Sequence, residues 1–183
     1  ILRYILIILM KEHAMKNLIM INGTMGVGKT ATCKELQKLL SNTVFLDGDW
    51  CWDMVPFTVN DETKCMVMDN IIFLLNNFLC CSVYENVIFC WVMHEQSIID
   101  EIISNLKRKD CKIYVFSLIC SEEALIRRIR KDISCGLRKN DVIVRALQRL
   151  CMYEKLNTEK IDVSEISAAT AAKPIKEMVC RKI

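Results

Sequence analysis

The sequence predicts an α/β fold, in which helices cover a mostly parallel sheet. From Met15 onward, short apolar runs alternate with longer amphipathic ones, which is the pattern of strand–helix units. One of these runs leads directly into a glycine-rich loop, which holds three of the five glycines of the chain. No repeat, linker or change of composition divides the sequence, so we expect a single domain over residues 15–183.

The strands and helices are expected in alternating order. Apolar runs with β-type composition predict strands over residues 17–21, 43–46, 86–93, 112–118 and 159–163. Amphipathic runs predict helices over residues 28–40, 62–80, 96–108, 122–131, 142–156 and 168–179. The first helix follows the glycine-rich loop. The fourth follows Ser121, a favourable N-cap, and has Glu122 and Glu123 in its first turn.

The first fourteen residues are expected to be a non-native upstream extension. Residues 1–10 are nearly all apolar, but the run is too short to span a bilayer and no small-residue cleavage site follows it. Lys11 and Glu12 can be encoded by AAG GAG, which resembles a bacterial ribosome-binding tract, and Met15 follows at a suitable distance. We therefore expect the natural protein to start at Met15.

Composition argues against several classes of protein. The net charge of +3 gives no reason to expect nucleic acid or a membrane as a partner. The 11 cysteines form no C-x-x-C pair and only 2 histidines accompany them, which disfavours a disulfide scaffold and a zinc site. We expect these cysteines to serve as small apolar residues in a cytoplasmic protein.

The glycine-rich loop has the spacing of a phosphate-binding loop. Residues 23–30 read G-x-x-x-x-G-K-T, the Walker A pattern, between a predicted strand and a predicted helix. Backbone N–H groups of such a loop surround phosphates, the lysine reaches the β- and γ-phosphates, and the threonine hydroxyl ligates Mg²⁺. The expected nucleotide contacts are Gly23, Thr24, Met25, Gly26, Val27, Gly28, Lys29, Thr30 and Thr32, with Lys29 also catalytic.

A second candidate motif follows the second strand. Asp47 and Asp49 are two residues apart, so in an extended segment both carboxylates point the same way, and Gly48 is expected to leave the space above the backbone open. We expect this strand to lie next to the strand of the phosphate loop. Asp47 would then help to hold Mg²⁺, and Asp49 would accept the proton of a substrate hydroxyl. The alternative is an ordinary Asp-Gly turn.

These motifs resemble the small-molecule kinases of the nucleoside-monophosphate-kinase-like P-loop group, which includes shikimate, gluconate and adenylylsulfate kinases. Over nearly the whole length the chain is most similar to tunicamycin-resistance proteins and related nucleotide kinases. The shared features are residues 21–23 and 26–30, the long helix from about residue 61, the strand ending near Met93 and His94, and the segment 125–132. The D-G-D departs from the tunicamycin-resistance pattern and matches gluconate and adenylylsulfate kinases.

The resemblance implies a three-layer α/β/α fold with a five-stranded parallel sheet and a short mobile lid. It also implies ATP as the phosphate donor and Mg²⁺ as the cofactor. In related kinases, arginines in the basic segment of the fourth helix stack on adenine or close over the phosphates. Arg128, catalytic and nucleotide-binding, is the first candidate and Arg130 the second, with Arg138 and Lys139 following. The alternative is a solvated basic helix end.

Other residues leave the acceptor undefined. The third strand ends in His94 and Glu95 rather than the aspartate of a Walker B motif, which disfavours motor ATPases; the role of His94 and Glu95 stays open. Aromatic and apolar residues after the D-G-D are expected either to line an acceptor pocket or to pack in the core: Trp50, Trp52, Met54, Pro56 and Phe57. No N-K-x-D guanine-binding motif is present.

The sequence therefore predicts an ATP-dependent phosphotransferase that transfers the γ-phosphate to a small molecule, at a hydroxyl group. Two alternatives remain. The first is a nucleotide kinase, and the second is a nucleotide-binding resistance or regulatory protein without catalytic turnover. A requirement for Asp49 would separate the enzyme from the binding protein.

Overall fold

The computed structural model describes residues 15–107, 110–138 and 141–181. The expected upstream extension, residues 1–14, lies outside the described residues. The strands are β1 Lys16–Asn22, β2 Thr43–Asp47, β3 Asn86–Cys90, β4 Cys111–Ile119 and β5 Glu159–Asp162. The α-helices are α2 Lys29–Leu39, α3 Asp61–Cys80, α4 Gln96–Ser104, α5 Glu122–Ser134, α6 Val142–Glu154 and α7 Ala168–Cys180, and a 3₁₀ helix, η1, spans Gly48–Trp52.

The five strands form one parallel sheet, as predicted, and their order in the sheet is β2-β3-β1-β4-β5. The expected position of β2 is wrong, because β3 lies between β2 and the phosphate-loop strand β1. Asp47 pairs in register with Cys90, and Cys90 pairs with Ile21. The D-G-D turn is therefore separated from the phosphate loop by one strand, and any contact between them must be made by side chains.

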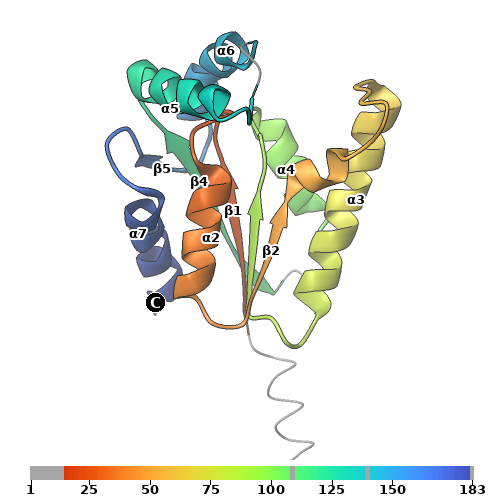
Figure 1. The fold of residues 1–183 in the computed structure, drawn as a ribbon. Helices are drawn as coiled ribbons and strands as arrows, with labels where there is room; N and C mark the ends of the chain where they lie inside the picture. The colour runs from red at the N-terminus through yellow and green to blue at the C-terminus, as the bar shows by residue number, and fades with distance from the viewer. Residues whose placement is uncertain (1–14, 108–109, 139–140, 182–183) are drawn as a thin grey trace, which may run out of the picture.

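Helices cover both faces of the sheet (Figure 1). One core contains Ile19 and Ile21 of β1 with residues from α2, α5 and α7, and the other contains Leu18 and Met20 with residues from α3 and α4. The alternation along β1 sends successive side chains into different cores, so this strand is buried on both faces. The expected three-layer α/β/α fold is confirmed. None of the described helices combines the length and the apolar character needed to cross a membrane.

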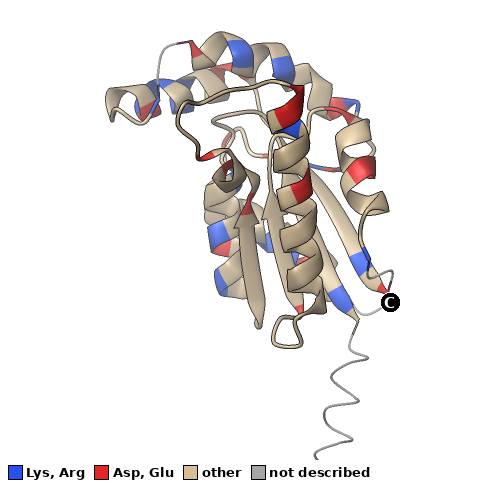
Figure 2. Cartoon of the chain, turned by 90° about the vertical axis from the view of Figure 1, so that its right-hand side faces the viewer, with Lys and Arg blue, Asp and Glu red and all other residues tan. Residues whose placement is uncertain are grey.

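Helices α5 and α6 lie above the carboxyl ends of the strands in Figure 1. Figure 2 shows that lysine and arginine recur along these helices. The segment between them contains Arg138, but Lys139 lies outside the described residues. The sheet, both helical layers and this pair of helices meet at the end of the molecule where parallel α/β sheets bind ligands.

The third strand is shorter than predicted. Pairing ends at Cys90, and the Trp91 N–H makes a last bond to the Ile21 carbonyl at 3.3 Å before the chain leaves the sheet. Residues 91–94 therefore form a loop rather than a strand end. This loop carries Trp91 and His94 toward the cavity described below.

Helix α3 begins with a reciprocal cap that fixes the entrance to this cavity. The Asn60 side chain accepts from the Thr63 N–H at 2.9 Å, and the Thr63 hydroxyl accepts from the Asn60 N–H at 3.0 Å. Asn60→Ala removes one half of this capping box, so we expect the free energy of unfolding to fall by about 1 kcal/mol in urea denaturation. Asn70→Ala, exposed on the same helix, is the control and should change it by less than about 0.5 kcal/mol. Equal effects would contradict the capping argument.

Candidate active site

The phosphate loop has the backbone that its glycines make possible. Gly23 and Gly26 have φ angles of 146° and 82°, and a Cβ at Gly23 would lie 2.8 Å from the Leu118 carbonyl oxygen. Substitution there is therefore excluded by both conformation and space. Gly28 is the N-cap of α2 and provides no side-chain cap, and the first turn of the helix carries no acidic residue. The first N–H groups of α2 are thus left to bind an anion from outside the helix.

Lys29 folds back over the loop. Its ammonium donates to the carbonyl oxygens of Gly23 at 2.9 Å and Thr24 at 3.1 Å. The atoms packed around it lower the pKa of Lys29 by desolvation, and the carboxylates of Asp49 and Asp47 oppose this shift. The charge of Lys29 is therefore held at the centre of the loop, where bound phosphate would compensate it better than water does.

Thr30 and Asp47 meet across the separation between the loop and β2. The Thr30 hydroxyl donates to Asp47 Oδ2 at 2.8 Å, and the Asp49 N–H donates to Asp47 Oδ1 at 3.1 Å. Both Asp47 oxygens are thus oriented, and the carboxylate is buried. A hydroxyl and a carboxylate side by side are the hard oxygen donors that Mg²⁺ prefers, so this pair fits the ion. Within the described ranges no cluster of three or more His, Cys, Asp or Glu could hold a metal.

Asp49 follows Asp47 in η1 and opens to the cavity beside the loop. The atoms crowded around it and, second, the Asp47 carboxylate raise the pKa of Asp49, while Lys29 and Arg138 lower it. Arg138 acts electrostatically on Lys29 as well, and it is held by an ion pair with Asp132 at 2.9 Å. The charge of Arg138 thus acts on both Lys29 and Asp49.

Two other predicted nucleotide contacts have different neighbours from those expected. The Thr24 hydroxyl is buried and donates to the Ala146 carbonyl of α6 at 2.8 Å, so it anchors the loop to that helix. Thr32 is buried in the first turn of α2. Met25 lies with its side chain at the edge of the cavity. The backbone of the loop remains the main candidate for phosphate contacts.

Arg128 is directed to backbone carbonyls rather than into open space. Its guanidinium donates to the carbonyl oxygens of Val27 at 3.2 Å, Ser164 at 3.4 Å and Val163. It therefore ties the phosphate loop to the segment after β5. Arg130 is exposed. Of the predicted arginines, Arg128 thus contacts the phosphate loop, whereas Arg138 pairs with Asp132 and acts on Lys29 and Asp49 through its charge.

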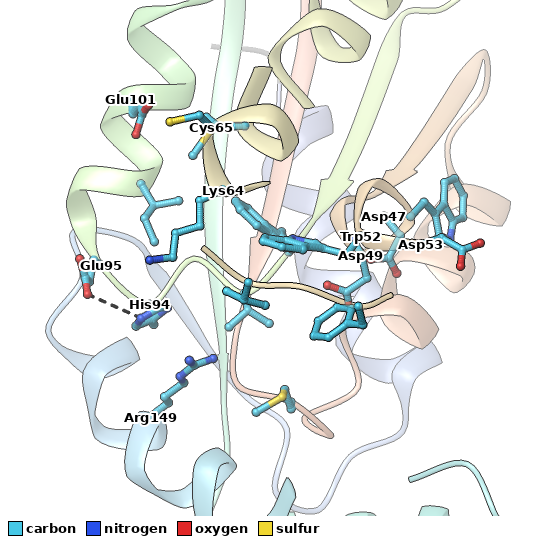
Figure 3. A pocket seen from close by; sticks show the side chains of 18 residues that line it. Asp47, Asp49, Trp52, Asp53, Lys64, Cys65, His94, Glu95, Glu101 and Arg149 are labelled. Atoms are coloured by element: carbon cyan, nitrogen blue, oxygen red, sulfur yellow. Dashed lines mark hydrogen bonds and ion pairs between the residues drawn. The ribbon is translucent and has the colours of Figure 1, made fainter. Parts of the chain in front are cut away.

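A cavity of about 1170 Å³ opens beside the D-G-D turn (Figure 3). Its lining joins the phosphate loop, η1, α3, the loop after β3, α4 and α6. The lining residues include Met25, Asp47, Asp49, Trp50, Trp52, Asp53, Phe57, Val59, Lys64, Trp91, His94, Glu95, Glu101 and Arg149. The expectation of an aromatic lining after the D-G-D is met for Trp50, Trp52 and Phe57.

The space beside Gly48 is occupied, contrary to the expectation that it stays open. A Cβ at this position would lie 2.6 Å from Cγ of Trp91. Gly48 is needed because the Trp91 indole packs directly on the backbone of the D-G-D turn. Trp91, which lines the cavity, therefore contacts the residue between the two carboxylates.

Sequence reasoning missed Lys64, Trp91 and Arg149 as cavity residues. Arg149 had a detectable signal, because Val142, Ala146 and Tyr153 are the buried positions of α6 and Arg149 falls on the same face by helical spacing. An arginine within an apolar helix face requires a polar or charged partner, from the protein or from a ligand. Trp91 had no comparable signal, since an aromatic residue at a strand end is usually part of the core.

Comparison with known proteins agrees with this geometry. A sequence model described as an AAA domain matches residues 19–147 of the chain. No curated protein sequence matches it significantly.

Among solved structures, the Deinococcus radiodurans tunicamycin resistance protein has 20% identity and a TM-score of 0.69, with 91% of this chain and 97% of that chain covered. A gluconokinase from Sinorhizobium meliloti 1021 has 16% identity and a TM-score of 0.62, with 92% and 97% covered. A shikimate kinase from Acinetobacter baumannii in complex with shikimate has 18% identity and a TM-score of 0.61, with 91% and 94% covered. At these identities the likeness establishes the P-loop kinase fold.

The tie made by Arg128 can be tested without nucleotide. Arg128→Ala leaves the Val27 and Val163 carbonyls without this donor, so we expect the free energy of unfolding to fall by about 1–3 kcal/mol in urea denaturation. Arg128→Lys should restore only part of the loss, because one ammonium does not reproduce a planar fork. Arg130→Ala is the matched control and should stay within about 0.5 kcal/mol. If Arg128→Ala behaves like the control, the tie contributes no stability.

Proposed function

We propose that the chain, which belongs to the AAA-domain family of P-loop proteins, is an ATP-dependent phosphotransferase. The γ-phosphate of ATP would be transferred to a hydroxyl group of a small-molecule acceptor. The observation that carries the proposal is the contact between Thr30 and Asp47, which joins the phosphate loop to the turn that carries Asp49 into a large cavity. Donor site and acceptor site thus share three consecutive residues, Asp47 to Asp49.

We assign binding of the phosphate donor, ATP, to the phosphate loop and the charged side chains next to it. The loop amides and Lys29 would hold the β- and γ-phosphates, and Thr30 with Asp47 would hold Mg²⁺, which supplies charge neutralisation on the phosphates when bound. The charge of Arg138 acts on both Lys29 and Asp49, and this guanidinium would stabilise negative charge that develops on the transferred group. Arg128 and Arg130 are assigned to the nucleotide side of the loop.

We assign the acceptor side to the cavity. Asp49 lies where the cavity meets the phosphate loop, so its carboxylate would orient the acceptor hydroxyl and take its proton as the oxygen attacks phosphorus. The backbone of Asp49 is held by the bond from its N–H to Asp47. The apolar walls would exclude water, which is the competing nucleophile.

The activity can be sought directly. The protein is incubated with Mg²⁺, ATP labelled at the γ-phosphate and a pool of small metabolites, and mass spectrometry then identifies a labelled compound heavier by one phosphoryl group. Transfer that the wild type makes and Lys29→Ala does not would support the proposal. Label appearing in inorganic phosphate alone would indicate an ATPase, and no turnover with retained ATP binding would favour the nucleotide-binding protein.

Lys29→Ala should weaken ATP binding and abolish turnover while the fold is retained, because the change removes a charge from the phosphate loop and little packing. Calorimetric titration with MgATP measures the affinity, and circular dichroism checks the fold. Lys38→Ala lies on the same helix, where Lys38 pairs with Glu35 at the surface, and should leave both properties unchanged. Unchanged affinity and turnover in Lys29→Ala would rule out the assignment.

The two carboxylates should respond differently to conservative change. Asp49→Asn keeps the shape but removes the base, so turnover should fall about 10²–10⁴-fold with ATP affinity nearly unchanged. Asp47→Asn should instead raise the Mg²⁺ concentration needed for ATP binding, because it weakens the oxygen donors of the metal site. Mg²⁺-dependent ATP affinity can be measured before an acceptor is known. Asp69→Asn, exposed on α3, controls for loss of a charge; identical modest losses in Asp47→Asn and Asp49→Asn would make the D-G-D a simple turn.

A further inference from the structure

All three tryptophans of the chain line the cavity beside Asp49. The Trp91 ring lies against the Gly48 backbone, at the reacting end. The Trp52 ring contacts Phe57, with ring centroids 6.1 Å apart. Trp50 packs edge-on against Phe45 with ring centroids 5.4 Å apart, so part of its ring is already in contact with the protein. Trp52 and Trp91 therefore both offer aromatic surface to a ligand in the cavity.

The mouth of the cavity carries apolar surface that the protein does not cover. Phe57 and Val59 belong to the lining, yet they are 68% and 56% exposed. When a ligand covers apolar side chains that are exposed to water at a concave site, the free energy of the system falls. With a volume of about 1170 Å³ the cavity is also larger than a six-carbon sugar acid requires. The lining thus suits a ligand with an extended, flat, apolar body.

One cation in the cavity lacks a partner. Lys64 pairs with Asp61 at 3.2 Å, and His94 lies 3.6 Å from Glu95. Arg149 extends from α6 into the cavity in Figure 3, and among the residues that the structure describes it makes no hydrogen bond or ion pair. A guanidinium with five donors directed into a partly enclosed space favours a carboxylate or phosphate group.

We propose that the acceptor is an aromatic carboxylate that bears a hydroxyl group. The ring would lie against Trp52 and Trp91, the carboxylate would bind Arg149, and the hydroxyl would reach Asp49. A singly charged carboxylate fits better than a phosphate dianion because Glu95 and Glu101 line the same cavity. This inference rests on the proposed phosphotransferase function, whose acceptor it specifies.

The tryptophans themselves report the binding. Protein labelled with 5-fluorotryptophan should give three ¹⁹F resonances, all from this cavity, and titration without ATP yields a Kd. The ligands share one skeleton: 6-hydroxy-2-naphthoate, neutral 2-naphthol, the cation 6-(aminomethyl)-2-naphthol, and the saturated decahydro analogue of the naphthoate. We expect the naphthoate to bind about tenfold or more tightly than naphthol, and several-fold more tightly than its saturated analogue.

The matched variants are Arg149→Gln and Arg145→Gln, which lie one helical turn apart on α6. Arg145 is exposed, pairs with Asp141 at 2.7 Å and does not line the cavity. Arg149→Gln should raise the Kd of the naphthoate about tenfold or more and leave that of naphthol unchanged. Arg145→Gln should change neither. A structural effect of Arg149 would instead move both ligands together, and this result would overturn the inference.

The outcomes separate this inference from the function on which it rests. Equal affinity for naphthoate and naphthol, or tighter binding of the amine, would overturn the aromatic carboxylate, as would demonstrated phosphate transfer to a cationic or an aliphatic acceptor. In the last case the phosphotransferase proposal would stand. Tight naphthoate binding that depends on Arg149, in a protein that transfers no phosphate, would support the ligand class and refute the function.

Discussion

The hydrogen bond from the Thr30 hydroxyl to the Asp47 carboxylate holds the candidate site together. Thr30 lies in the first turn of α2, whereas Asp47 ends β2, which lies one strand away from the loop. No backbone ladder joins β2 to β1, so the side chains span the strand between them. The remaining groups are placed relative to this bond: Lys29 precedes Thr30, and Asp49 is oriented by the other oxygen of Asp47.

The parts of the site that were predicted from sequence depend on local geometry. The Walker A spacing predicts a loop whose backbone angles only glycine adopts easily, and Gly23, Gly26 and Gly28 have such angles. Alternating periodicity predicts five strands and their parallel pairing, because each connection contains a helix. The order of the strands could not be obtained in this way. Whether β2 lies beside β1 or beyond β3 depends on how the long α3 and the shorter α4 pack on the sheet, which involves contacts between distant residues.

The hydrogen bonds and ion pairs of single side chains were harder to predict than the helices and strands that carry them. Arg128 and Arg138 both lie in the basic region that the sequence identifies, yet Arg128 binds the Val27 carbonyl of the loop while Arg138 pairs with Asp132. The contacts of Arg128 could not be predicted from the sequence, because its acceptors come from residues 27, 163 and 164, far away in sequence. The bond from the Thr24 hydroxyl to the Ala146 carbonyl of α6 likewise joins distant residues. Such pairings appear only when three elements are brought together.

The contact between Gly48 and Trp91 links recognition of the acceptor to the geometry of transfer. Trp91 leaves β3 at the point where pairing ends, and its ring lies on the backbone that joins Asp47 to Asp49. A side chain at residue 48 would displace the ring or the turn, since the closest approach would be 2.6 Å. A flat ligand stacked on the free face of Trp91 would therefore be separated by one ring from the short segment that carries the candidate base and the candidate metal ligand. Asp47 of that segment is hydrogen-bonded to Thr30 of α2. The position of the ligand ring on Trp91 would therefore set the distance from the acceptor hydroxyl to the phosphate loop. Acceptors of other thickness or curvature would place their hydroxyl group away from the phosphate.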